Sequence, residues 1–175
     1  MKTVKESIKD SLEWLGLEYI DLYLIHNPAW GGDIKDTWRE MRGVKKEGWA
    51  KSIGVSKYVL LSHDSSHGWI RADVSFSVEQ LKEIINDSGV TPAINQIRFH
   101  PKVLAESEAL LEFHKEHGIV TEGYSPIKPL RDGTSPGLVK VVGKIAKEKG
   151  VEPDQVLLAW SKAKGYVTSS SLLLR

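Results

Sequence analysis

The stretch IDLYLIHNP, residues Ile20–Pro28, decides the fold class of this chain. Its apolar run is typical of a strand in a parallel sheet that is covered on both faces. The run ends on His26, and an Asn-Pro pair then breaks the strand. Barrels and doubly wound α/β proteins hold their chemistry at the carboxyl ends of such strands. His26 is therefore the first candidate functional residue.

Helical and strand patterns alternate along the rest of the chain. Apolar residues at helical spacing predict helices at Val4–Leu15, Ile34–Lys46, Ser77–Asn86, Leu104–His117, Leu138–Lys149 and Asp154–Lys164. Apolar runs between them predict strands at Ile20–His26, Ala50–Ser56, Ala93–His100, Ile119–Ser125 and Gly165–Ser171. This alternation predicts right-handed βαβ units and an α/β fold with a parallel sheet. Periodicity alone leaves open whether the sheet closes into a barrel or stays open and doubly wound.

The composition narrows the class of protein. A chain of 175 residues with 41% hydrophobic residues can form one domain with a substantial core. Its 24 basic and 23 acidic residues give a net charge of +1, which predicts no nucleic-acid or membrane partner. No signal peptide or membrane-spanning run is recognised, so a cytoplasmic protein is expected. The absence of cysteine excludes disulfides and a cysteine nucleophile, and no glycine-rich phosphate-binding fingerprint is present.

Five segments together resemble the aldo-keto reductases, a family of (β/α)8 barrels that reduce carbonyls with NADPH. They are SLEWLGLEYIDLYLIHNP (Ser11–Pro28), KEGWAKSIGVS (Lys46–Ser56), PAINQIRFHP (Pro92–Pro101), HGIVTEGYSPI (His117–Ile127) and PDQVLLAW (Pro153–Trp160). The resemblance implies an incomplete barrel of the TIM type, with about five of the eight strands and without the N-terminal βα units. Residues 1–175 are then one partial reductase domain acting on a small-molecule carbonyl substrate. The HNP variant and YSPIKPL are similar to the fungal branch that reduces α-keto amides and conjugated polyketones.

The resemblance also implies roles for particular residues. His26 matches the histidine that hydrogen-bonds the substrate carbonyl. Ser56 and Gln96 match residues that hold the nicotinamide carboxamide of NADPH. Tyr124 matches the aromatic platform under the nicotinamide, and Ser125 begins a loop that contacts the pyrophosphate.

The end of the chain departs from the family pattern. Ser169, Ser170 and Ser171 fall where the adenosine phosphate of NADPH would lie. The family then places a lysine and an arginine nearby, whereas this chain continues with Leu172. Binding of NADPH is therefore expected to be weak.

The same family pattern leaves this chain without a proton donor. The tyrosine of the family's catalytic tetrad, with its supporting lysine and aspartate, belongs to segments that would precede Met1. Tyr23 cannot replace it, because a residue three positions before His26 lies on the opposite face of the strand. Tyr124 would be covered by the nicotinamide, and Tyr19 lies at the wrong end of the strand. The reductase activity of this polypeptide is expected to be impaired.

Two readings of the chain remain open beside the reductase. One is a non-catalytic remnant or a misread gene product, with self-association possible through unpaired sheet edges. The other is an unrelated binding module on half a barrel, which only the fold would support.

An internal segment, Tyr58–Ser75, interrupts the family pattern directly after Ser56 and Lys57. It is interpreted either as an unspliced segment retained in frame, since its borders can be encoded with splice signals, or as a true loop insertion. Within it, His63 and His67 could share a metal only on a helix, which the neighbouring serines and glycine disfavour. No metal site is predicted.

Several other residues are expected to be structural. The tryptophans on predicted helices, Trp14, Trp38 and Trp160, are expected in the core or between layers. His100, at a strand end before Pro101, is expected to have a structural role.

Overall fold

The protein is described by a computed structural model that covers residues 2–26, 33–64 and 68–169, with the backbone alone at 57–64, 68–75 and 169. Its longer helices are α1 (Val4–Leu15), α2 (Ile34–Lys46), α3 (Val78–Ser88), α4 (Glu108–His117), α6 (Pro136–Lys149) and α7 (Pro153–Ala163). Shorter helical turns are η2 (Pro101–Val103), η3 (Ala105–Ser107) and α5 (Lys128–Arg131). None of the helices in the described ranges is long and apolar enough to cross a membrane.

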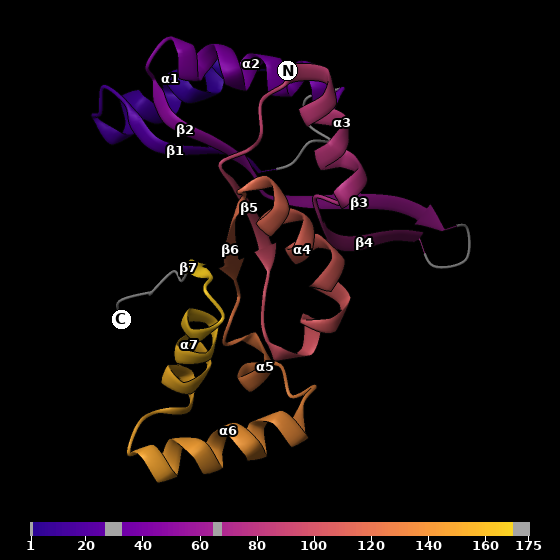
Figure 1. Ribbon diagram of the computed structural model, residues 1–175, viewed down its shortest axis with the longest axis vertical. Coiled ribbons are helices and arrows are strands. Elements are labelled where there is room, and N and C mark those ends of the chain that lie inside the picture. The colour runs from indigo at the N-terminus through magenta and orange to yellow at the C-terminus, as the bar shows by residue number, and fades with distance from the viewer. Residues whose placement is uncertain (1, 27–32, 65–67, 170–175) are drawn as a thin grey trace.

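The strands confirm the predicted parallel sheet. Five of them, β1 (Ile20–Ile25), β2 (Ala50–Val55), β5 (Ile94–Arg98), β6 (Val120–Tyr124) and β7 (Val167–Ser169), form one sheet in the order β1-β2-β5-β6-β7. Every pairing in it is parallel. β1 and β7 are the outer strands, so within the described residues the sheet stays open (Figure 1).

Local signals in the sequence explain where α1 begins and ends. The Thr3 side chain accepts a hydrogen bond from the backbone of Glu6, whose carboxylate accepts one from the backbone of Thr3. This capping box satisfies N–H groups that have no partner within the helix. Gly16 ends α1 in the left-handed conformation, with φ of 65°, which glycine adopts without steric penalty. The predicted bounds of this helix are confirmed.

The main core lies between the sheet and the helices α1, α2 and α3. Ile8, Trp38 and Leu81 bring the three helices onto the same cluster as Ile53 and Val55 of β2. Within this core the indole N–H of Trp38 donates to the carbonyl oxygen of Val90, at 3.2 Å. The expected burial of Trp38 is confirmed.

Trp14 corrects the expectation for the tryptophans. Its side chain is 95% exposed, because α1 turns Ile8 and Leu12 toward the core and Trp14 away from it. Trp160 is partly buried and stacks on Phe99, with ring centroids 5.2 Å apart.

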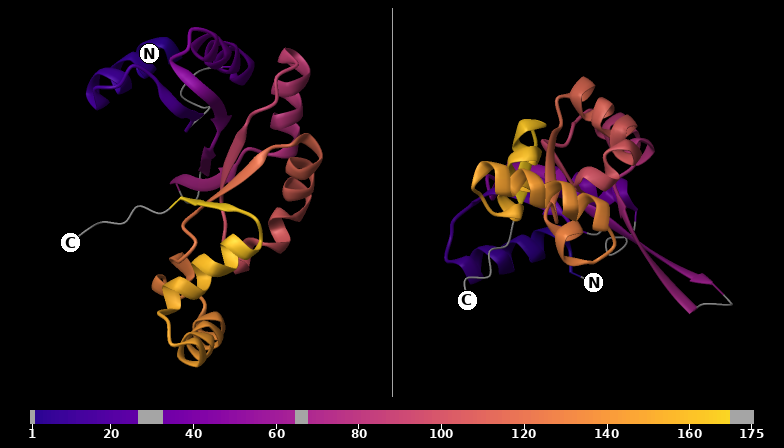
Figure 2. Two further views of the ribbon diagram at one scale, coloured as in Figure 1. Left: turned by 60° about the vertical axis from the view of Figure 1, so that its left-hand side comes forward. Right: turned by 90° about the horizontal axis from the view of Figure 1, so that it is seen from below.

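The inserted segment forms an antiparallel hairpin of its own. β3 (Lys57–Asp64) pairs with β4 (Gly68–Ser75) along their whole length and extends away from the body of the molecule (Figure 1 and Figure 2, right). His63 therefore lies in a strand, which rules out the helical spacing considered for a shared metal, while His67 lies outside the described residues. No group of three potential metal ligands occurs in the part of the chain that the structure describes.

The hairpin lies where β2 and β5 separate. These strands are joined by the register pair Val55–Asn95 and by the hydrogen bond from the Ala93 N–H to the Ile53 oxygen, at 2.9 Å. Both strands of the hairpin contact β5. The insertion thus occupies the carboxyl end of β2, beside the predicted site.

Candidate functional site

The sheet register places four polar residues in one row across neighbouring strands. Ile25 pairs with Val55 and Val55 with Asn95, so the following residues His26, Ser56 and Gln96 are adjacent. Gln96 in turn pairs with Glu122 of β6. Three of the four residues were predicted as site residues from the sequence, and the fold brings them to one level of the sheet.

The row faces away from the helix-covered core. Ile25 and Val55 belong to the core cluster, and side chains alternate between the two faces of a strand. His26 and Ser56 therefore lie on the other face, which we call the inner face because a barrel of this topology would enclose it. His26 is exposed there.

A side-chain hydrogen bond fixes the centre of the row. The Ser56 hydroxyl donates to Oε1 of Gln96 at 3.0 Å. The Ser56 residue is only 1% exposed, and its backbone N–H also donates to the Ile25 oxygen, at 2.9 Å. Because Oε1 of Gln96 accepts this bond, the amide N–H2 group points away from Ser56 and is the donor of this side chain.

Tyr124 and Ser125 lie one step further along β6. Tyr124 is partly buried and pairs with Arg98 on one side and Ser169 on the other. Ser125 has φ of 55°, the one positive value among the described residues other than glycine. Such strained backbone gathers at ligand-binding and catalytic sites. Ser169 lies in β7, whereas Ser170 and Ser171 lie outside the described residues.

The position of Tyr23 confirms that it faces away from His26. Tyr23 packs against the main core on the helix-covered face. Burial raises the pKa of its phenol, and a hydrogen bond with Ser11 of α1 acts in the opposite direction. Its hydroxyl is therefore engaged on the side of the sheet opposite to the row.

His100 lies at the end of β5 and is buried, with its Nδ1 atom lacking a hydrogen-bond partner in the described residues. Burial lowers the pKa of His100, and the nearby Arg98 and Lys102 lower it further. The imidazole is therefore neutral near pH 7. Its place immediately before Pro101 and η2 fits the structural role expected from the sequence.

Sequence reasoning missed Glu122. Its Oε2 atom is buried and meets no hydrogen-bond donor in the part of the chain that the structure describes. The signal was present, because Glu122 stands two positions before Tyr124 in an alternating strand and must share its face.

A second polar group that the sequence did not reveal lies under α4. His114, only 1% exposed, joins Asn95 through Nε2 at 3.0 Å and Thr121 through Nδ1 at 2.8 Å. Since the Asn95 amide donates to Nε2, the proton must be on Nδ1. Burial lowers the pKa of His114 to about 4. This network ties α4 to β5 and β6 from the helix-covered side.

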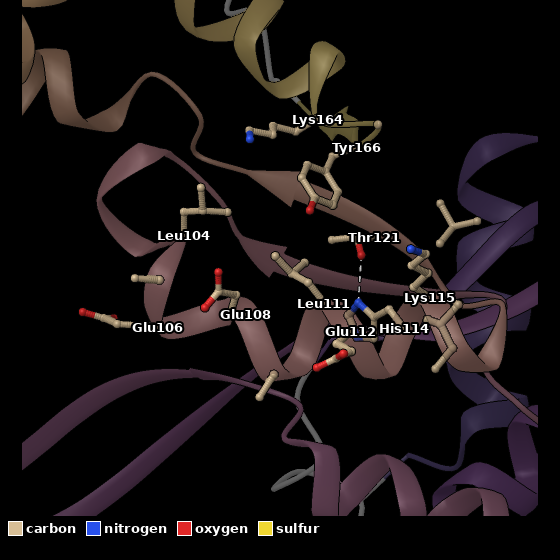
Figure 3. Close-up of a pocket in the computed structure, with 15 residues that line it drawn as sticks. Leu104, Glu106, Glu108, Leu111, Glu112, His114, Lys115, Thr121, Lys164 and Tyr166 are labelled. Atoms are coloured by element: carbon tan, nitrogen blue, oxygen red, sulfur yellow. Dashed lines mark hydrogen bonds between the residues drawn. The ribbon is translucent and has the colours of Figure 1, made fainter.

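A cavity of about 1100 Å³ lies on that side, between α4 and the segment Lys164–Tyr166 (Figure 3). His114 and Thr121 line it, together with Leu104 and Leu111. Among the residues whose side chains the structure describes, no predicted site residue lines this cavity. The row on the inner face therefore remains the candidate site.

Comparison with known proteins identifies the family. The model of the Aldo/keto reductase family matches residues 1–172. The chain is 32% identical over 169 residues to an NAD/NADP-dependent indole-3-acetaldehyde reductase of Schizosaccharomyces pombe, covering 94% of this chain and 53% of that protein. It is 39% identical over 157 residues to 2,5-diketo-D-gluconic acid reductase B of a Corynebacterium species, covering 89% and 48%.

Solved structures agree with this assignment. The crystal structure of a Gox0644 mutant in complex with NADPH superposes with a TM-score of 0.72 at 33% identity, covering 94% of this chain and 52% of that one. The chain thus spans about half the length of the relatives and structures that it matches. Over that span, the motifs, the parallel sheet and the family model agree, and the chain belongs to the aldo/keto reductase family.

Proposed function

We propose that this chain carries the carbonyl-orienting and nicotinamide-contacting half of an enzyme that reduces aldehydes or ketones to alcohols with NADPH. The observation that carries the proposal is the row His26–Ser56–Gln96, in which a hydrogen bond of 3.0 Å holds the Gln96 amide toward the inner face. Relatives with reductase names and a neighbour crystallised with NADPH support it.

The residues present fit a nicotinamide. The N–H2 group of Gln96 offers a donor to a carboxamide oxygen, and the Ser56 hydrogen bond to Oε1 fixes the orientation of this amide. Tyr124 supplies an aromatic ring two positions beyond the level of this amide, and the strained backbone at Ser125 begins the next loop. When bound, NADPH supplies the hydride that reduces the carbonyl carbon.

In this proposal His26 binds the carbonyl group of the substrate. Its imidazole stands exposed at the open end of the row and can donate a hydrogen bond to a carbonyl oxygen. That bond orients the carbonyl and stabilises the negative charge that develops on its oxygen as hydride arrives.

Proton delivery is the step for which, in our proposal, the described residues offer no tyrosine. Tyr23 faces the core, and Tyr166 packs edge-on against Phe99 with ring centroids 4.2 Å apart. A positioned general acid typically contributes about 10²–10⁴-fold to the rate. The 175-residue polypeptide is therefore proposed to bind NADPH weakly and to turn over slowly.

The test is to express residues 1–175, titrate NADPH by fluorescence, and follow NADPH oxidation with aldehydes and α-keto esters. We expect measurable binding, turnover at least about 10²-fold below that of full-length relatives, and a further loss in His26→Ala. Turnover equal to that of the relatives would refute the impairment. Absence of NADPH binding would refute the reductase site itself.

A non-catalytic remnant is the second candidate, and the open sheet favours it. Within the described residues, β1 and β7 each have one unpaired edge, and such edges promote association. A remnant would associate through these edges and bind no NADPH. Size-exclusion chromatography beside the NADPH titration separates the two candidates.

A further inference from the structure

We propose that Glu122 is a binding residue that accepts a hydrogen bond from the amide N–H2 of the nicotinamide carboxamide. The inference rests on the proposed function and adds a contact to the same site. Its basis is the juxtaposition of Gln96, which carries an amide donor, and Glu122, whose Oε2 atom has no hydrogen-bond partner among the described residues, on the inner face.

Glu122 carries a buried polar atom that has no partner in the part of the chain that the structure describes. Neither the amide N–H2 group of the neighbouring Gln96 nor any other described donor makes a hydrogen bond to Oε2. Leaving a buried acceptor without a partner destabilises a folded protein, and such atoms are rare in native structures. An acceptor kept at this level of the sheet therefore indicates a donor that arrives with a ligand.

The register defines what kind of ligand fits. Gln96 and Glu122 are paired on adjacent parallel strands, about 4.8 Å apart. Oε1 of Gln96 accepts from Ser56, so the N–H2 group is the part of this amide that the Ser56 bond leaves without a role, and Glu122 beside it offers the oxygen Oε2. A planar primary amide, with a carbonyl oxygen next to an N–H2 group, complements this pair.

The residue that follows Ser56 offers no acceptor for an amide N–H. The position after Ser56 is Lys57, which begins the hairpin strand β3. A lysine ammonium has donors and no acceptor. Glu122, on the strand β6 that pairs with β5 on the side away from Ser56, supplies an acceptor for the nicotinamide carboxamide.

The test compares two cofactors and two substitutions. NADPH carries the amide, whereas its reduced 3-acetylpyridine analogue has a methyl ketone there and no N–H. Glu122→Met removes the acceptor at similar size, and Glu122→Gln retains a neutral oxygen. Glu116→Gln, on the exposed side of α4, is the matched control.

We expect Glu122→Met to weaken NADPH binding roughly 10- to 100-fold, as for a lost bond to a charged group. The affinity of Glu122→Met for the acetylpyridine analogue should stay within about twofold of that of the unmodified chain. Glu122→Gln should lose less NADPH affinity than Glu122→Met, and Glu116→Gln should bind NADPH as the unmodified chain does. The thermal midpoint of Glu122→Met without ligand should be unchanged or higher, because an unpartnered acceptor has been removed.

The inference would be overturned if Glu122→Met bound both cofactors more weakly by the same factor, with or without a lower thermal midpoint. Such a result would show that Glu122 only supports the fold. Unchanged NADPH binding in Glu122→Met would overturn it and leave the proposed function standing. If the unmodified chain binds neither cofactor, both proposals fall.

Discussion

The Ser56 hydroxyl and the Gln96 amide, forty residues apart in sequence, are joined by a hydrogen bond of 3.0 Å on the inner face of the sheet. Ser56 is almost fully buried, so this bond both holds β2 to β5 and sets the direction of the amide. Two strands that share the register pair Val55–Asn95 gain a second, side-chain connection at the next position.

Ser56→Ala should lower the free energy of unfolding by about 1 kcal/mol, because a buried hydrogen bond is lost and Oε1 of Gln96 loses its donor. Urea denaturation followed by circular dichroism measures this change. Ser52→Ala, on the same strand and the same face, is the matched control because no side-chain hydrogen bond is found for Ser52 among the described residues. An equal loss in both variants would contradict the structural role assigned to Ser56.

Gly54→Ala should destabilise the sheet by about 1–3 kcal/mol, in the range of overpacked cores. A Cβ at this position would lie 2.5 Å from the backbone oxygen of Ile94 and 2.8 Å from Cδ2 of Leu24. Gly43→Ala is the control, because nothing lies within 4 Å of a Cβ there, and it should stabilise the helix by about 1 kcal/mol. Thermal unfolding of both variants measures the difference, and a neutral Gly54→Ala would show that β2 and β5 are not so close.

The free energy of unfolding should fall as the pH drops from about 6.5 to about 4. Burial lowers the pKa of His114 to about 4 in the folded protein, whereas the unfolded chain takes up a proton near pH 6.5. The unfolded state therefore binds more protons in this interval, and the loss at His114 totals roughly 3 kcal/mol. His100, whose pKa is also lowered by burial, adds to the loss in the same direction.

Urea denaturation at a series of pH values, with His114→Gln and His117→Gln, tests the origin of this slope. The His114 variant should reduce the slope to the part that His100 contributes, and the variant of the exposed His117 is the control. An unchanged slope in His114→Gln would contradict the buried network with Asn95 and Thr121.

Deleting Tyr58–Ser75, with Lys57→Asn, should leave the sheet folded and tighten NADPH binding. The hairpin strands pair only with each other and not with the five-stranded sheet, and removing them joins the end of β2 to the buried Phe76. The deletion also frees the space beside Ser56 where β3 begins. Circular dichroism and NADPH fluorescence titration measure the two effects. Loss of the cooperative unfolding transition would show that the hairpin is part of the fold.

Local signals explain which elements were predictable. The bounds of α1 and α2 were predicted to the residue, because the capping box at Thr3 and the turn at Gly16 mark α1, while Asp33 caps α2. The strands came out shorter than predicted, since β5 pairs only over Ile94–Arg98 and β7 is described over Val167–Ser169. The apolar sequence patterns continue beyond the ends of the strands into the loops. Strand pairing stops earlier, because it requires a partner on the neighbouring strand.

Long-range relationships were harder to predict. The row His26–Ser56–Gln96 followed from motif resemblance, but its register with Glu122 depends on how β5 and β6 align. The antiparallel pairing of Lys57–Ser75 and the exposure of Trp14 likewise depend on neighbours that local sequence does not reveal. Whether Ser170 closes a cofactor site stays a prediction, because it lies outside the described residues.

Titration of NADPH into the unmodified polypeptide and into Gln96→Leu tests the account most directly. We predict saturable binding to the unmodified chain and binding at least about 10-fold weaker in Gln96→Leu. Both proteins should unfold cooperatively and be fully folded at the temperature of the titration, with a lower thermal midpoint in Gln96→Leu because the buried Ser56 hydroxyl loses its acceptor. Equal affinity in two equally folded proteins would contradict the assignment of the inner-face row as the nicotinamide site.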